Sequence, residues 1–116
     1  FNSLRVPFHY KFFSPDTGVF INDGFDIIDP VLEWCSNNGI YLILDMHCAP
    51  GGQNRNDFSD GNGEEAGLWV HEYNRDWTVS IWKYIADYYS EAQWIGGYDL
   101  LNEPELEGGF SSLNLR

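Results

Sequence analysis

The pattern of apolar and polar residues predicts three short strands in this chain. The first comprises residues 1–8, with apolar residues at Leu4, Val6 and Phe8. Pro7 lies at the end of the run, where a missing backbone donor is tolerated. Residues 40–44 are almost continuously apolar, which is typical of a strand buried on both faces of a parallel sheet. A third short apolar run, residues 98–101, predicts another buried strand.

Two segments between these strands carry the apolar periodicity of a helix. The first comprises residues 23–38. Its apolar stripe has steps of three, four and three, at Phe25, Ile28, Leu32 and Cys35. Pro30 removes a backbone donor, so we expect a kink there or a regular helix that begins only near Asp29. Asn38-Gly39 is a favourable C-terminal stop, because glycine adopts the left-handed conformation easily.

The second predicted helix is capped by Asn74 and extends to about Ser90. Its apolar face follows the same steps, at Val79, Trp82, Ala86 and Tyr89. A long polar, glycine-rich loop precedes it, from Cys48 to about Gly67. Loops of this length without regular structure are usually functional.

The order strand, helix, strand, helix, strand predicts an α/β fold with two consecutive right-handed βαβ units on a parallel sheet. In such folds, ligands bind at the carboxyl ends of the strands. The first strand carries Arg5, the second delivers Asp45 and His47, and the third delivers Asn102 and Glu103. An arginine, a histidine, an amide and a carboxylate at one edge are typical of a sugar or acyl-transfer site rather than of packing.

Glu103 is the residue in this group most suited to proton transfer. It follows a strand and precedes Pro104, so it lies where the strand stops. Burial beside aromatic side chains would raise the pKa of such a carboxyl and allow it to act as a general acid. Neighbouring strand residues point to opposite faces, so a bulge or twist is needed for Asn102 and Glu103 to face one site. The alternative is a solvated glutamate in a turn.

Other residues at the same edge also admit structural interpretations. Asp45 and His47 share a strand face and could bind a metal, but only one histidine and one aspartate lie there, which favours a hydrogen-bonding His47. Arg5 can serve as an ion-pair partner of a carboxylate. Trp69 after the long loop is either a core residue or a platform for a sugar ring. The remaining tryptophans are expected to pack: Trp34, Trp77, Trp82 and Trp94.

Composition narrows the possible partners. The chain has 116 residues, 43% apolar and 17% aromatic, which excludes a disordered acidic tail. With 18 acidic and 6 basic side chains the formal charge is −12, which argues against nucleic acids and anionic membranes. No apolar run approaches the roughly 18 residues of a membrane span. Cys35 and Cys48 are expected to be unpaired, packed thiols.

Three stretches of the sequence resemble a known family. They are Leu4-Arg5-Val6-Pro7, then Leu44-Asp45-Met46-His47 with Ala49-Pro50-Gly51-Gly52-Gln53-Asn54, and finally Tyr98-Asp99-Leu100-Leu101-Asn102-Glu103-Pro104. They resemble glycoside hydrolase family 5, the cellulases and β-glucanases, which are (β/α)8 barrels that retain the anomeric configuration. The resemblance implies that residues 1–116 are a partial catalytic domain with barrel strands two to four and two helices. The run at 49–54 resembles the exo-β-1,3-glucanases, while bacterial endoglucanases stay open.

The resemblance also implies a role for each residue at the strand ends. Glu103 would be the acid/base, and Asn102 would hydrogen-bond the 2-hydroxyl of the sugar being transferred. His47 would contact a hydroxyl of that sugar, and Arg5 would keep the nucleophilic carboxylate ionised. The substrate would be a β-glucan oligo- or polysaccharide, no metal or organic cofactor would be required, and the enzyme would be secreted.

The chain departs from the family in one large respect. A (β/α)8 barrel needs about 250 residues, and the nucleophilic glutamate of the family belongs to strand seven. We therefore expect a fragment that needs the remaining barrel strands, from the same or another chain, and is inactive alone. Two alternatives stay open: a non-catalytic carbohydrate-binding fragment, and a metal-dependent hydrolase that uses Asp45 and His47.

Overall fold

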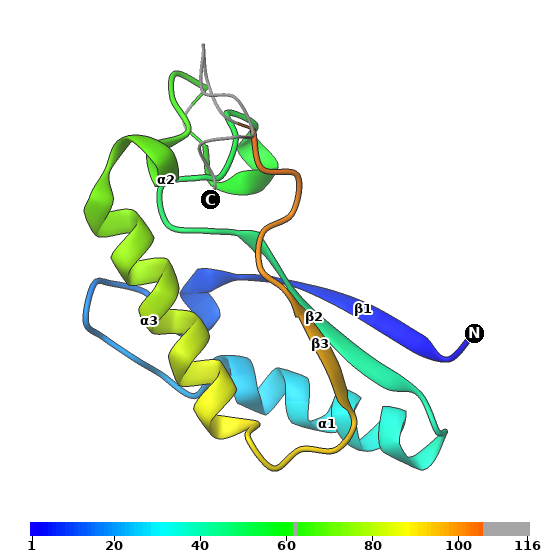
Figure 1. The fold of residues 1–116 in the computed structure, drawn as a ribbon. Coiled ribbons are helices and arrows are strands. Elements are labelled where there is room, and N and C mark those ends of the chain that lie inside the picture. The colour runs from blue at the N-terminus through cyan, green and yellow to red at the C-terminus, as the bar shows by residue number, and fades with distance from the viewer. Residues whose placement is uncertain (62, 106–116) are drawn as a thin grey trace.

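Three parallel strands form one sheet in the order β1-β2-β3 (Figure 1). They are β1 (Ser3–His9), β2 (Tyr41–Cys48) and β3 (Ile95–Asp99). The connecting helices are α1 (Asp23–Asn37), the short α2 (Gly67–Val70) and α3 (Glu72–Tyr88), and two 3-10 turns are η1 (Tyr10–Phe12) and η2 (Asp57–Ser59). The computed structural model describes residues 1–61 and 63–105. The predicted alternation of parallel strands and crossover helices is confirmed.

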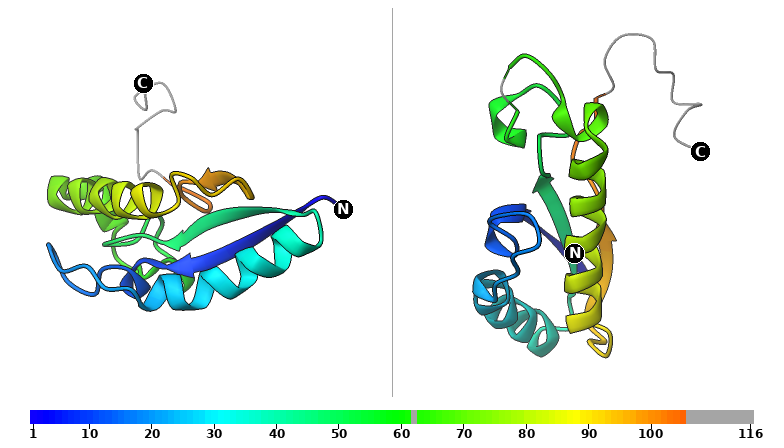
Figure 2. Two further views of the ribbon diagram at one scale, coloured as in Figure 1. Left: turned by 90° about the horizontal axis from the view of Figure 1, so that it is seen from below. Right: turned by 90° about the vertical axis from the view of Figure 1, so that its left-hand side faces the viewer.

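The two faces of the sheet differ in chemistry. Val6 of β1 lies in register with Leu44 of β2, and both belong to the apolar core. Pro7 and Asp45 are the next partners in register and lie on the opposite face, because side chains alternate along a strand. The core also contains the inward residues of both long helices: Phe25, Ile28 and Cys35 of α1 and Ile81 and Ile85 of α3. Both helices therefore cover the apolar face, and Figure 2 shows α1 lying along the strands.

Helix α1 matches its predicted limits and apolar stripe. It begins at Asp23 and contains Pro30, so the alternative of a helix that starts near Asp29 is wrong. Pro30 is exposed, and so is Asp26, whose carbonyl loses its helical partner and can be hydrated instead. Gly39 has a φ of 67° and follows the helix, as expected of a C-terminal stop.

Helix α3 starts earlier than predicted, and its buried face matches the predicted one only in part. Its N-cap is His71, so the prediction that Asn74 caps the helix is wrong. Asn74 is instead buried, and its Nδ2 donates to the Gly67 carbonyl over 3.0 Å. Of the predicted face, Tyr89 is buried and Trp82 packs against the core, but Val79 is 52% exposed. The buried residues within the helix are Asn74, Thr78, Ile81 and Ile85. Thr78 can be buried because its Oγ1 donates to the Asn74 carbonyl, which hydropathy alone does not reveal.

Strand β3 lies earlier in the sequence than the apolar run at 98–101. Its register pairs Leu42 with Ile95 and Asp45 with Asp99. Glycines are unfavourable in strands, so the apolar pattern did not indicate that β3 begins at Ile95, directly before Gly96 and Gly97. Position 96 requires glycine for space, since a Cβ there would lie 2.8 Å from the Cβ of Tyr41. Asn102 and Glu103 consequently lie beyond the strand end.

Aromatic and polar side chains join the two long helices. The hydroxyls of Tyr88 and Tyr89 both donate to Asp29, over 2.7 and 2.8 Å. Phe25 stacks on Tyr88 with the ring centroids 3.7 Å apart. Trp34 is 50% exposed, so the expectation that it packs is wrong, while Trp77 and Trp82 pack against the core.

Two further expectations concern cysteines and membranes. Cys35 and Cys48 are free thiols, which confirms the prediction that they are unpaired. Burial raises the pKa of both thiols. None of the helices within residues 1–61 and 63–105 is both long and apolar enough to cross a bilayer.

The corrected face of α3 gives a stability prediction. Ile81→Ala should lower the free energy of unfolding by about 2–5 kcal/mol, because it leaves a cavity in the core. Val79→Ala, on the exposed face of the same helix, should change it by less than about 0.5 kcal/mol. Urea unfolding followed by circular dichroism measures both, and equal losses would contradict the assignment of the buried face.

Candidate active site

Arg5 ties the carboxyl ends of the strands together. Its Nε donates to Asp99 Oδ2 over 2.9 Å, and its Nη2 donates to Asn102 Oδ1, also over 2.9 Å. The same Nη2 lies 3.1 Å from Asp45 Oδ2. The interpretation of Arg5 as an ion-pair partner is therefore confirmed, and its side chain stays 43% exposed. Sequence reasoning missed Asp99, although its register with Asp45 places it on the same face.

The hydrogen bonds determine the protonation of His47. Arginine has donors only, so the Asn102 atom that Arg5 contacts must be the amide oxygen. The amide nitrogen of Asn102 then faces His47 Nε2 at 3.3 Å and donates to it. The remaining ring nitrogen, Nδ1, carries the proton and donates to Asp45 Oδ2 over 2.7 Å. The expected hydrogen-bonding role of His47 is thus present in this arrangement.

Asp45 is the buried centre of this network. Its side chain has no exposed surface, and its Oδ2 accepts from both His47 and Arg5. Its Oδ1 has no hydrogen-bond partner within residues 1–61 and 63–105. A buried carboxylate needs a compensating charge, and Arg5 supplies it. The Asp45–His47 pair offers two candidate metal ligands, and the described part of the chain supplies no group of three or more His, Cys, Asp or Glu side chains for a metal ion.

Glu103 lies just beyond this network. Asn102 is buried and its backbone N–H donates to the Met46 carbonyl over 3.2 Å, so the segment follows β2 past the end of β3. Glu103 is exposed and has a φ of 43°, in the left-handed region. The aromatic surroundings expected to bury its carboxyl are not provided by the described residues. Other parts of the site must therefore come from elsewhere if Glu103 is to be desolvated.

The loop after β2 bonds to the backbone of the residues that form the site. Gln53 is fully buried, and its Nε2 donates to the carbonyls of His47 and Asn102 over 2.7 and 2.9 Å. Its Oε1 accepts from the Ala49 N–H over 3.1 Å. Trp69 Nε1 donates to the Gln53 carbonyl, and its ring packs against the core, which favours a structural role for Trp69 over a sugar platform. No charge or hydrophobic period singled out Gln53, because its role depends on contacts with two strand ends.

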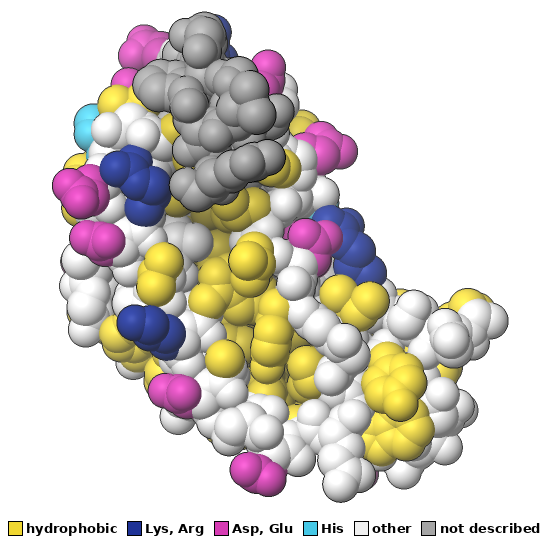
Figure 3. Space-filling model, in the orientation of Figure 1, with side chains coloured by type: hydrophobic (Ala, Val, Ile, Leu, Met, Phe, Trp, Pro, Cys, Tyr) yellow, Lys and Arg dark blue, Asp and Glu magenta, His cyan; other side chains and the backbone are white. Residues whose placement is uncertain are grey.

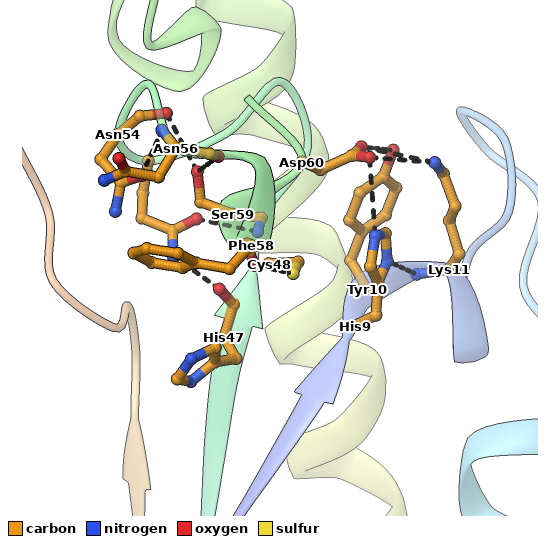
Figure 4. Close-up of polar contacts among 12 residues, drawn as sticks. His9, Tyr10, Lys11, His47, Cys48, Asn54, Asn56, Phe58, Ser59 and Asp60 are labelled. Carbon is orange, nitrogen blue, oxygen red and sulfur yellow. Dashed lines mark hydrogen bonds and ion pairs between the residues drawn. The ribbon is translucent and has the colours of Figure 1, made fainter. Parts of the chain in front are cut away.

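A second polar cluster attaches the far side of the same loop to β1. Figure 4 shows Asp60 facing Tyr10, Lys11 and His9. The Tyr10 hydroxyl donates to Asp60 over 3.1 Å, Lys11 Nζ lies 3.3 Å away, and His9 Nε2 lies 3.6 Å away. Burial raises the pKa of Tyr10, and the neighbouring Asp60 raises it further. Burial lowers the pKa of His9, although Asp60 opposes this shift.

A family model decides which proteins this chain is related to. The model of cellulase, glycosyl hydrolase family 5, matches residues 1–112. The chain belongs to glycoside hydrolase family 5.

Individual relatives of this family 5 chain are enzymes of glycan breakdown by name. A β-xylosidase of Phanerodontia chrysosporium is 40% identical over 89% of the chain, and endoglucanase C of Acetivibrio thermocellus is 33% identical over the same share. A probable glucan 1,3-β-glucosidase A of Neosartorya fischeri is 30% identical over 99% of the chain. The chain covers 22, 29 and 28% of these proteins respectively, so it spans about a quarter of their length.

Solved structures agree with the family 5 assignment. A glycoside hydrolase of known structure is 32% identical, with a TM-score of 0.76 over 99% of this chain and 35% of that one. Rutinosidase from Aspergillus niger has a TM-score of 0.73 at 16% identity, over 89% of this chain and 30% of that one, and shares the fold. The fold expected from the sequence, part of a (β/α)8 barrel, is confirmed.

The hydrogen bonds predict opposite tautomers for two neutral histidines of the family 5 chain. His47 should carry its proton on Nδ1, because Asn102 donates to its Nε2. His9 should carry its proton on Nε2, because its Nδ1 accepts from the Lys11 N–H over 3.2 Å. Long-range proton–nitrogen NMR at about pH 8, above the usual imidazole pKa of about 6.5, distinguishes the two.

Asp45→Asn provides the control for this assignment. An amide can donate as well as accept, so the His47 proton should redistribute between its two nitrogens, while His9 stays unchanged. A wild-type His47 that is protonated on Nε2 would contradict the network described above.

Proposed function

We propose that the chain is part of the catalytic domain of a retaining β-glucanase. Residues 1–116 supply barrel strands two to four, and the whole domain cleaves O-glycosidic bonds of a β-glucan by double displacement. The observation that carries the proposal is the network of Arg5, Asp45, His47 and Asn102 at the strand ends, directly before Glu103. The glucanase and glucosidase names of relatives support a glucan substrate, and secretion stays a prediction from the same resemblance.

Glu103 is the proposed acid/base. Its exposed carboxylate lies beyond the carboxyl end of β3, where barrel enzymes bind their substrates. In its protonated form Glu103 gives a proton to the leaving oxygen while the nucleophilic carboxylate attacks the anomeric carbon, and this step leaves Glu103 as a carboxylate. It then deprotonates the water that releases the sugar. Carboxylates carry out both steps, so the mechanism requires no metal or organic cofactor.

Asn102 and His47 are proposed to bind the sugar being transferred. Asn102 Nδ2 has two hydrogens, and only one of them bonds His47, so the second can bond the 2-hydroxyl. His47 Nε2 has a single lone pair, so a sugar hydroxyl that donates to it would replace the long 3.3 Å contact with Asn102. Arg5 is proposed to stabilise the ionised form of the nucleophilic carboxylate. Its guanidinium is partly exposed, and it already forms ion pairs with Asp45 and Asp99.

The nucleophile is proposed to come from outside this chain. Among the described carboxylates near the strand ends, Asp45 and Asp99 are both held by Arg5, and Asp60 is already hydrogen-bonded. Asp45 is also buried and bonded to His47. The isolated chain should therefore be inactive, and this favours a carbohydrate-binding fragment as the second candidate for the chain by itself.

The isolated chain should be marginally stable or should self-associate. Among the described residues, β1 and β3 each pair with β2 alone, so each leaves one backbone edge unpaired. Figure 3 shows hydrophobic side chains gathered in a hollow between α3 and β3. Its lining includes Leu68, Trp69, Val79, Trp82, Leu100 and Leu101. Analytical ultracentrifugation measures the self-association, and thermal unfolding measures the stability. A monomer at micromolar concentration that unfolds in one sharp transition would contradict this prediction.

Glu103→Gln tests the acid/base role in the barrel completed by the remaining strands. The value of kcat/KM for unactivated glucosides should fall by about 10²–10⁴-fold, the usual contribution of general acid–base catalysis. The loss should shrink for activated aryl glucosides, whose leaving groups depart without protonation. Azide should restore part of the turnover, because an anionic nucleophile needs no base.

His47→Ala is the comparison for Glu103→Gln. It should weaken sugar binding by a similar factor for all leaving groups, because His47 is proposed to contact the sugar and not the leaving oxygen. Equal losses of Glu103→Gln on activated and unactivated glucosides, without azide rescue, would remove Glu103 from the acid/base role.

A further inference from the structure

The loop after β2 and the segment after β3 are joined by side chains of two consecutive residues. Gln53 donates to the Asn102 carbonyl over 2.9 Å, and Asn54 Nδ2 donates to the Glu103 carbonyl over 2.9 Å. The Glu105 N–H returns a bond to the Gln53 carbonyl over 3.0 Å. Two neighbouring amides of the loop thus hold two neighbouring residues of the site.

Glu103 has a backbone conformation that needs such support. Its φ of 43° lies in the left-handed region, which glutamate rarely adopts. Pro104 adds to the cost, because the residue before a proline favours extended conformations. Uncommon backbone conformations persist only where the surrounding contacts determine them.

The orientation of the Asn54 side chain is fixed from both ends. Its Oδ1 accepts from the Asn56 N–H over 2.9 Å, so its Nδ2 must point to Glu103. The side chain is almost fully buried, with 1% of the residue exposed. The Asn54 carbonyl accepts from Ser59 Oγ over 3.0 Å, which fixes its backbone as well (Figure 4).

We propose that Asn54 is a positioning residue for the acid/base. It holds the Glu103 carbonyl and with it the left-handed backbone conformation from which the Glu103 side chain extends, while Gln53 fixes the adjacent Asn102. This inference rests on the proposed function, since it assigns Asn54 to the proton-transfer step. A misplaced catalytic group is costly: a shift of about 1 Å can lower a rate by about 10²-fold.

Asn54→Ala in the completed barrel tests the proposal through the dependence on the leaving group. The value of kcat/KM for unactivated glucosides should fall by about 10–100-fold, and for dinitrophenyl glucosides by less than about threefold, because only the former need the acid. Asn54→Asp is the second variant, since it keeps the acceptor for Asn56 and lacks the donor for Glu103. It should show the same selective loss if Asn54→Ala does not fold.

A control variant alters the same loop without touching Glu103. Asn56→Ala removes an exposed side chain and keeps the backbone N–H that donates to Asn54 Oδ1. It should lower activity, if at all, equally for all leaving groups. A loss in Asn54→Ala that is equally large for activated and unactivated glucosides would overturn the proposal, because it would indicate loosening of the loop alone.

A structural measurement on the completed barrel separates this inference from the proposed function. The carbonyl carbon resonance of Glu103 should shift in Asn54→Ala and stay in place in Asn56→Ala, because only Asn54 donates to that carbonyl. An unchanged resonance in Asn54→Ala would overturn the inference whether or not the enzyme is a glucanase. An inactive wild-type barrel with the shift present would instead refute the proposed function.

Discussion

A buried carboxylate and its arginine organise the polar edge of this sheet. Asp45 is fully buried, and an unpaired charge at that position would be strongly destabilising. Arg5 neutralises it from the neighbouring strand and also holds Asp99 and Asn102, so β1, β2 and the segment after β3 are fixed to one another. The orientation of the Asn102 amide follows from arginine being a donor only, and the His47 tautomer follows from the amide. One ion pair thus determines the direction of the hydrogen bonds that Asn102 and His47 make.

One face of the sheet packs into the core, and the other face carries the polar residues of the candidate site. The residues that face α1 and α3 are apolar and form the core, as Leu42, Leu44 and Met46 do in β2. The residues of the other face gather charges at the carboxyl ends, where a barrel enzyme of glycoside hydrolase family 5 has its site. Three strands therefore suffice to hold Arg5, Asp45 and His47 in a fixed arrangement at one edge. Under the proposed mechanism, a nucleophilic carboxylate and the desolvation of Glu103 must be added to what the described residues provide.

The loop after β2 is long but firmly held. Gly51 has a φ of 78°, and a Cβ there would lie 2.2 Å from Asn74 Nδ2, so the chain can pass close to α3 only as glycine. Gln53 then reaches into the core behind the strand ends, and Asp60 attaches the far side of the loop to Tyr10 and Lys11. The loop is thus held at both sides, and its Gln53 and Asn54 side chains bond the backbone of Asn102 and Glu103.

The sequence by itself determined the α/β class, the order of the elements and the limits of α1, because apolar periodicity is a local signal. It also determined the grouping of Arg5, His47 and Asn102, because polar residues at the ends of parallel strands are recognisable locally. Only the tertiary structure decided the rotation of α3, the start of β3 at Ile95, and the parts played by Asp99, Gln53 and Asn54. Thr78 is buried despite its polar side chain, because its hydroxyl is hydrogen-bonded. Gly96 lies in a strand despite its low strand propensity, because Tyr41 leaves no room for a side chain there. Gln53 and Asn54 bind residues 49 positions away, and no pattern confined to neighbouring residues records a contact of that separation.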